Sequence, residues 1–254
     1  MKLFATLLAG LISLLFGCDS KAPYEKRNGV WHFDGRPLAI KQPDQFQPLI
    51  GPFAKGADHG YYRGGAIEDS DGPSFEALDE QYARDKSRAW YCGTARKSQE
   101  YYSIRHNRII ELDGVEASKF RLLSRSYARD ERKLFFEGTP IPVKDLNSFE
   151  VLDNNYARDK VTGYHLQKPI PGTDGATFTA IDMHYSKDKA SVFYYATDYF
   201  TSPVTHTIIR VAGANAATFT VMENPNEQAD ARDAHATYRQ GKRVPPGEDK
   251  ARGI

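Results

Sequence analysis

The side chains best suited to metal or acid-base chemistry are seven histidines that are spread along the chain. They are His32, His59, His106, His165, His184, His206 and His235. No two of them lie within five residues of each other. A zinc site on one helix needs histidines four residues apart, so the sequence predicts no site of that kind.

One acidic stretch, Asp69-Ser70-Asp71-Gly72, begins like a calcium-binding loop and has Glu80 at its twelfth position. Pro73 stands where such a loop carries Asp or Asn, and the next position lacks the required glycine. Gly-x-Ser-x-Gly, Gly-x-Gly-x-x-Gly and P-loop patterns are absent. Cys92 lies between aromatic residues and Gly93, which favours a small packing residue over a reactive thiol. We therefore predict no metal, no cofactor and no catalytic residue.

The strongest chemical signal is Leu15-Phe16-Gly17-Cys18, which resembles the lipobox of bacterial lipoproteins. Lys2 precedes an apolar run over residues 3–16 that suits a secretory signal and is short for a spanning helix. The thiol of Cys18 would carry a diacylglyceryl thioether, and the small Gly17 would let the peptidase approach the backbone. Because Phe16 is bulky for its position, an ordinary signal peptide with an incidental cysteine is the alternative.

Processing at this point predicts a mature chain of residues 18–254, anchored by lipid on Cys18 in the bacterial envelope and facing the periplasm. Several acyl chains would hold it stably, at roughly 0.8 kcal/mol per buried methylene. Asp19 resembles the signal that retains enterobacterial lipoproteins in the inner membrane. The chain has 34 basic and 33 acidic residues, and loss of Lys2 balances them. Neutrality and export argue against nucleic acid as a partner.

A pattern of about 29 residues recurs from residue 30 onward. The clearest copies, Ser74 to Gly93 and Ser148 to His165, contain Ser-Phe-Glu-x-Leu followed by Tyr-Ala-Arg-Asp-Lys and an aromatic pair. The leading phenylalanines are Phe46, Phe75, Phe120, Phe149, Phe178 and Phe219, with spacings of 29, 45, 29, 29 and 41. We interpret the 45 as a full copy followed by a half-copy of 16 residues around Arg96-Lys97 and Tyr101-Tyr102.

Each repeated position has a physical interpretation. Aromatic pairs before x-Gly predict hairpins, and Asp34-Gly35 is a preferred type I′ turn. The Asp of Tyr-Ala-Arg-Asp can accept a bond from the amide two residues on and close a turn. Its neighbouring Arg is expected over aromatic rings of the next copy. Phe-x-x-Leu predicts a short strand, with a turn before Phe. His32 and His165 stand at positions filled elsewhere by Tyr, Trp or Phe, which favours packing roles.

These units predict an all-β fold, in which tandem short β-hairpin or meander repeats of two or three strands stack as an elongated or curved array. A closed propeller is the rival, disfavoured by the unequal spacings. We assign residues 1–17 to the signal peptide, 18–29 to the lipidated Cys18 and a tether, 30–244 to the repeats and 245–254 to a flexible tail. An aromatic content of 12% with a mean hydropathy of −0.59 excludes a polytopic membrane protein and a disordered chain.

The repeats resemble the DKNYY family of bacterial proteins, which is named for an Asp-Lys-Asn-x-x-x-Tyr-Tyr core. The residues that carry the resemblance are Asp85-Lys86 with Trp90-Tyr91, and Asp188-Lys189 with Phe193-Tyr194. This chain departs from the core in having Ser87, Val161 and Ala190 where the family has Asn. The resemblance covers roughly residues 30–244. It implies secreted or lipid-anchored bacterial proteins of undetermined activity, without assigned catalytic residues.

We therefore expect a non-catalytic, membrane-anchored binding or scaffold lipoprotein whose ligand is an envelope protein or glycan. Repeat faces rich in Tyr and Arg suit such contacts. One alternative is an immunity protein that neutralises a periplasmic toxin. Another is an enzyme whose site lies in the irregular segments 94–117 or 196–216.

Overall fold

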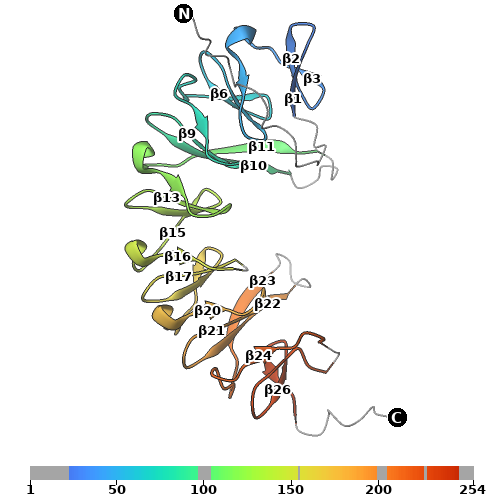
Figure 1. The fold of residues 1–254 in the computed structure, drawn as a ribbon, viewed down its shortest axis with the longest axis vertical. Coiled ribbons are helices and arrows are strands. Elements are labelled where there is room, and N and C mark those ends of the chain that lie inside the picture. Colours follow the sequence, from blue (N-terminus) through green and yellow to red (C-terminus); the bar gives the residue numbers. More distant parts are fainter. Residues whose placement is uncertain (1–22, 97–103, 154, 199–204, 226–227, 246–254) are drawn as a thin grey trace, which may run out of the picture.

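The computed structural model describes residues 23–96, 104–153, 155–198, 205–225 and 228–245. Within them the chain forms seven small antiparallel sheets, in which neighbouring strands are consecutive in the sequence (Figure 1). The all-β fold predicted from the sequence is confirmed. We call the sheets units 1 to 7 in chain order.

The strands of units 1 to 3 are β1 (Tyr24–Arg27), β2 (Val30–Phe33) and β3 (Arg36–Pro37), then β4 (Gln47–Pro48), β5 (Phe53–Lys55), β6 (Gly60–Tyr62) and β7 (Gly65–Ile67), then β8 (Glu76–Ala77), β9 (Tyr82–Arg84), β10 (Ala89–Ala95) and β11 (His106–Glu111). Those of units 4 and 5 are β12 (Arg121–Leu122), β13 (Tyr127–Arg129), β14 (Leu134–Phe136) and β15 (Thr139–Ile141), then β16 (Glu150–Val151), β17 (Tyr156–Arg158), β18 (Gly163–His165) and β19 (Lys168–Pro169). Those of units 6 and 7 are β20 (Thr179–Ala180), β21 (Tyr185–Lys187), β22 (Val192–Asp198) and β23 (Thr205–Arg210), then β24 (Thr220–Val221), β25 (Ala231–Arg232), β26 (Thr237–Arg239) and β27 (Lys242–Arg243).

The units follow one another along an open, curved array, with the two termini at opposite ends (Figure 1). This arrangement is the elongated or curved array expected from the sequence, and it is not a closed propeller. Units 2 to 7 have four strands each, so the expectation of two or three was too low. One of the four is the two-residue segment after the leading Phe, which confirms the strand predicted for Phe-x-x-Leu and pairs with the Tyr-Ala-Arg strand, as in Glu76 opposite Arg84.

Short 3-10 turns lie directly before four of the leading phenylalanines, as predicted. They cover Pro43–Gln45, Ala117–Lys119, Leu146–Ser148 and Gly175–Thr177. All lie on the convex side of the array in Figure 1. In the two turns where a cap is formed, Asp145 and Asp174 each accept a backbone amide bond at the start of the turn.

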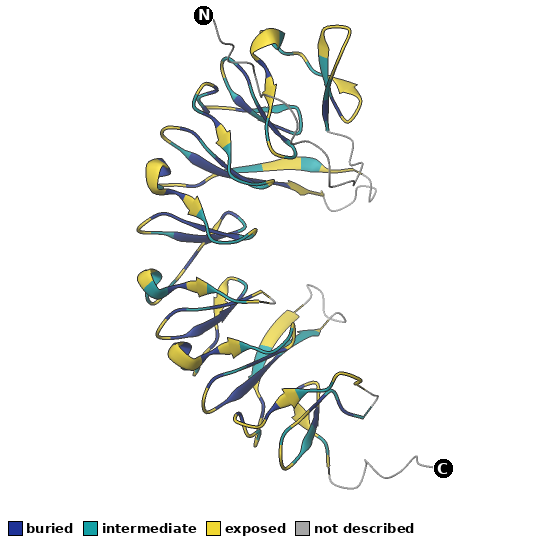
Figure 2. Cartoon of the chain, viewed as in Figure 1, coloured by how far each residue is buried: buried dark blue, intermediate teal, exposed yellow. Residues whose placement is uncertain are grey.

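The core is a chain of aromatic rings that passes from one unit to the next. Tyr82 of unit 3 packs against its own Tyr91 at 5.2 Å between ring centroids and against Phe120 of unit 4 at 6.0 Å. Tyr82 and Phe120 are at most 1% exposed. Figure 2 shows the buried residues concentrated on the central strands, where units face each other. Burial of one such ring stabilises the fold by roughly 1.5–3 kcal/mol. A single unit cannot bury its rings by itself, so this stabilisation requires neighbouring units.

Two long hairpins interrupt the regular spacing and correct the sequence interpretation. β10 pairs with β11 over six residues, from Trp90 opposite Glu111 to Ala95 opposite His106. The strands flanking the proposed half-copy therefore pair with each other, which leaves no place for a further unit. Residues 97–103, which include Lys97, Tyr101 and Tyr102 of that half-copy, lie outside the described residues. β22 and β23 form the matching hairpin in unit 6, so both segments that were expected to be irregular contain paired strands, at residues 94–95 and 106–111 and at residues 196–198 and 205–210.

The predicted tether is also corrected at its end. Residues Tyr24–Arg27 form β1 and pair with β2, so the repeat array begins before residue 30. Tyr24 is 5% exposed, and its hydroxyl donates to the carbonyl of Pro52 at 2.9 Å and accepts from the amide of Gly64 at 3.0 Å. Unit 1 thus supplies the same inter-unit tyrosine as later units.

Candidate functional site

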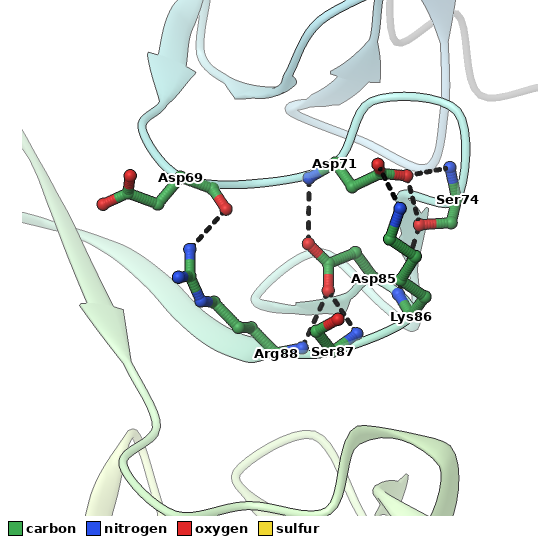
Figure 3. A network of polar contacts seen from close by, with 7 residues as sticks. All are labelled: Asp69, Asp71, Ser74, Asp85, Lys86, Ser87 and Arg88. Carbon is green, nitrogen blue, oxygen red and sulfur yellow. Dashed lines mark hydrogen bonds and ion pairs between the residues drawn. The ribbon is translucent and has the colours of Figure 1, made fainter.

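The aspartate of each Tyr-Ala-Arg-Asp segment holds two pieces of backbone together. In unit 3, one carboxylate oxygen of Asp85 accepts from the amides of Ser87 and Arg88, both at 2.7 Å. The other accepts from the amide of Asp71 at 2.9 Å (Figure 3). The first contact confirms the predicted turn, and the second ties that turn to the linker entering the unit. Asp130, Asp159, Asp188 and Asp233 make the same two kinds of contact.

The lysine after this aspartate binds the same linker. The ammonium of Lys86 lies 2.7 Å from a carboxylate oxygen of Asp71, and its amide donates to the hydroxyl of Ser74 at 3.2 Å (Figure 3). The hydrogen bond from Lys86 lowers the pKa of Asp71 to about 2. Lys160 pairs with Asp145, and Lys189 with Asp174, in the same way. The Asp-Lys pair is therefore a clamp on the linker.

Sequence reasoning missed the linker half of this clamp, although a signal for it was present. Asp71-x-x-Ser74, Asp145-x-x-Ser148 and Asp174-x-x-Thr177 each begin 14 residues before the clamped aspartate. The prediction considered only the local turn, because side-chain bonds from Asp are most often made within a few residues.

The Tyr and Arg of the same segment reach the next unit. The hydroxyl of Tyr82 donates to the carbonyl of Ser126 at 2.9 Å and accepts from the amide of Gly138 at 3.3 Å. The guanidinium of Arg84 donates to the carbonyls of Ala117 and Phe120 at 3.0 and 2.9 Å. The expectation that this Arg lies over aromatic rings was wrong, because its guanidinium instead donates to carbonyls at the two ends of the neighbouring 3-10 turn, and a carbonyl oxygen can accept more than one hydrogen bond.

These contacts define an open all-β repeat protein whose recurring polar residues join backbone segments and consecutive units. The polar groups of these residues therefore stabilise the array. The same repeated residues carry a match to the DKNYY family over residues 53–197, more than half of the chain, and the chain belongs to that family. The match runs from β5 into β22, and the structure extends the same unit on both sides, to Tyr24 and to Arg243. No curated protein and no solved structure matches the chain significantly.

The residues predicted to carry chemistry are placed as follows. Cys18 and Asp19, with the whole signal segment, lie outside the described residues. Cys92 is fully buried, and burial raises the pKa of its thiol, so it packs as predicted. In the calcium-like stretch, Asp71 binds Lys86, and Glu80 binds Arg125 at 2.9 Å. The residues that the structure describes contain no group of three or more metal-ligating side chains, and none of their helices could span a membrane.

The two long hairpins are the features that the repeat itself does not require. Units 2 to 4 recur as units 5 to 7 at an offset of 103 residues, so that Phe75 corresponds to Phe178 and Tyr91 to Tyr194. The offset is 99 residues for β11 and β23 and for the leading Phe120 and Phe219. Each half carries one long hairpin, and both project on the side toward which the array bends (Figure 1). Units 4, 5 and 7 close the same position with short hairpins. The long hairpins are therefore additions to the scaffold and form the candidate binding surface.

Tyr195 and His206 of the second long hairpin form a cluster with His165 of β18. The hydroxyl of Tyr195 lies 2.7 Å from Nδ1 of His206, and the ring of Tyr195 lies 3.8 Å from that of His165. These side chains line a cleft of about 250 Å³. Burial lowers the pKa of His165 to about 4, with smaller contributions from His206 and His184. The predicted packing role of His165 is confirmed, whereas His32 is only half-buried.

The corresponding positions of the first half are Tyr62, Cys92 and Asn107. The same backbone therefore accommodates quite different side chains at this point. The contrast marks the long hairpins as the place where the two halves have diverged in chemistry.

Proposed function

We propose that the protein is a lipid-anchored, non-catalytic binding or scaffold module of the bacterial envelope. Its ligand, a protein or a glycan, contacts the open side of the array between and along the two long hairpins. The observation that carries the proposal is the contrast between these hairpins and the rest of the repeat. The recurring polar groups are engaged in internal clamps, whereas the hairpins extend beyond what packing needs.

A matched variant for testing this surface comes from the repeat itself. In unit 4, Phe136 and Thr139 form the last pair before a two-residue turn. Gly93–Arg108 and Ala196–Thr207 have the same parity in the ladder as that pair, because they lie two pairs beyond the corresponding positions. Replacing residues 94–107 or 197–206 by Asn-Gly therefore closes either hairpin without a register slip.

The test is crosslinking in intact cells followed by recovery of the full-length protein. We expect a reproducible envelope partner with the wild-type protein and its loss when both hairpins are shortened. Recovery of the same partner by the doubly shortened protein, at an unchanged melting temperature, would contradict the proposed surface. Recovery of a secreted toxin would assign the narrower role of an immunity protein.

The lipid anchor is part of the proposal and is tested separately. The support for it is the lipobox-like Leu15-Phe16-Gly17-Cys18 and the apolar run before it. Cys18→Ser should abolish labelling by radioactive palmitate and release the protein from the membrane fraction. Labelling that persists in this variant would refute the anchor. Separation of inner from outer membranes tests the inner-membrane location that Asp19 suggests.

A further inference from the structure

Two clefts lie beside the long hairpins, one in each half of the chain, and their linings overlap at equivalent positions such as Pro140 and Arg243. Each lies between a long hairpin and the short hairpin of the following unit. The first, of about 440 Å³, separates β11 from β14 and β15, and the second, of about 650 Å³, separates β22 and β23 from β26 and β27. Ile110 lines the first cleft and the equivalent Ile209 lines the second.

The walls of both clefts are held by the same contact. Gly138 and Gly241 are 103 residues apart and adopt φ of 76° and 74°. The amide of Gly138 donates to the hydroxyl of Tyr82 at 3.3 Å, and that of Gly241 to the hydroxyl of Tyr185 at 2.9 Å. The backbone of the two clefts is therefore built in the same way, and the first serves as an internal reference for the second.

The two clefts differ in charge. Arg239, Lys242 and Arg243 line the second cleft. The equivalent residues of the first half are Phe136, Thr139 and Pro140, none of them charged, and of these Pro140 lines the first cleft. The cations at the first cleft have internal partners: Arg132 donates to the carbonyl of Gly114 and Lys133 to that of Asp113. Among the residues that the structure describes, Arg239, Lys242 and Arg243 form no ion pair, and all three are exposed.

The arrangement of these cations is unfavourable for the protein alone. Arg239 and Lys242 are direct partners across β26 and β27, and like charges facing each other across an antiparallel pair destabilise it. Among the described residues, no carboxylate lines the cleft. The nearby Asp230 is engaged by the hydroxyl of Tyr185 at 2.7 Å and by the amide of Gln240 at 2.7 Å. Since the first cleft is built without these cations, the fold does not explain them.

We infer that the second cleft binds the phosphate group of an envelope molecule. Guanidinium groups form paired hydrogen bonds with phosphate oxygens, and a lysine adds a point charge. Thr207 and Gln240 line the same cleft, and a threonine hydroxyl and a glutamine side-chain amide suit a sugar or glycerol attached to the phosphate. The rings and aliphatic groups of Tyr194 and Ile209 offer an apolar floor. The inference rests on the proposed binding function and names a ligand class for one part of its surface.

The test is calorimetric titration of the full-length protein in neutral detergent with glucose 1-phosphate, glycerol 3-phosphate and glucose. We expect binding of a phosphate-bearing probe and none of glucose. Preference for glucose 1-phosphate would indicate a phosphorylated glycan, and preference for glycerol 3-phosphate a phospholipid headgroup. The triple variant R239Q/K242Q/R243Q should bind at least 10-fold more weakly.

Two variants at the first cleft provide matched controls. R132Q/K133Q should leave phosphate binding unchanged, whereas T139K/P140R should add a second binding site. An absence of heat with both phosphate probes, or unchanged binding by the correctly folded triple variant, would overturn the inference. If that variant still recovers the crosslinked partner, the proposed function stands without the phosphate site. If the protein with both hairpins shortened still recovers the partner, while the wild-type protein binds a phosphate probe, the proposed binding surface is refuted and the phosphate site is not.

Discussion

Replacing Asp159 by alanine should destabilise the array more than any exposed charge substitution. This carboxylate is 1% exposed and accepts five hydrogen bonds. The donors are the hydroxyl of Tyr164 at 2.6 Å and the amides of Lys144, Asp145, Val161 and Thr162 at 2.7 to 3.0 Å. The variant removes every acceptor at once.

The size of the loss follows from which donors water can reach. Thr162 and Tyr164 are buried, so their two donors would stay unsatisfied, at about 1–3 kcal/mol each. Lys144 and Val161 are exposed, and water can replace the carboxylate there. We therefore expect Asp159→Ala to lower the free energy of unfolding by about 3 kcal/mol. For a chain of this size that corresponds to a fall in Tm of roughly 6–12 °C.

The same contacts predict how the effect depends on pH. Burial alone would raise the pKa of Asp159, but the bonds from Tyr164, Thr162 and other donors outweigh it, so the pKa is lowered. A carboxyl with a lowered folded pKa contributes its full stability above its unfolded pKa, about 3.9, and loses it as the pH falls through the folded value. The gap between wild type and Asp159→Ala should therefore be constant near neutrality and shrink below about pH 4.

Thermal unfolding followed by circular dichroism at several pH values measures both effects. Asp44→Ala is the matched control, because the Asp44 side chain is 93% exposed and makes one surface ion pair with Lys26. We expect that control to change stability by less than about 0.5 kcal/mol. Equal losses of stability in Asp159→Ala and Asp44→Ala would refute the clamp. A stability difference between wild type and Asp159→Ala that grows as the pH falls would also refute it.

Three further predictions test the packing of the array. Tyr82→Phe should cost about 1 kcal/mol, whereas Tyr156→Phe should cost less, because the Tyr156 hydroxyl lies beside Ser186 and, among the described residues, bonds to no carbonyl of the next unit; equal losses in chemical denaturation would argue against the inter-unit bond. Gly138→Ala should be more destabilising than Gly35→Ala by about 2 kcal/mol, because both have positive φ but only at Gly138 would the new Cβ come within 2.7 Å of a tyrosine. The buried Cys92 should resist iodoacetamide until the protein unfolds, and mass spectrometry showing rapid alkylation of the native protein would contradict its placement.

The parts of the fold that the sequence predicted are those governed by contacts within a few residues. The Asp34-Gly35 turn and the turn closed by Asp85 depend only on neighbouring amides, so their residue types were sufficient. The linker clamp between Asp71 and Lys86 spans 15 residues, and the bond of Tyr24 to Pro52 spans 28. No local pattern indicates such partners, which is why β1 was interpreted as part of a tether.

The long hairpins were missed for a different reason. A strand that extends a hairpin and a strand that begins a new unit use the same aromatic and β-branched residues. In the sequence, Tyr101-Tyr102 therefore matches the aromatic pair of a repeat. Only the pairing of β10 with β11 distinguishes the two arrangements. The basic cleft was not predicted either, because no local pattern in the sequence indicates that Arg239 and Arg243 line a cleft together with the distant Ile209.

The most direct test of the proposed binding surface is site-specific photocrosslinking in living cells. A photoreactive residue would be placed at Thr94 and at Thr207, which are exposed on the two long hairpins, and at Ser118 and Ala176, which are exposed in 3-10 turns on the convex side. We expect a discrete adduct from the hairpin positions and none from the convex positions. Adducts of the same mass from the convex positions alone would contradict the proposed binding surface.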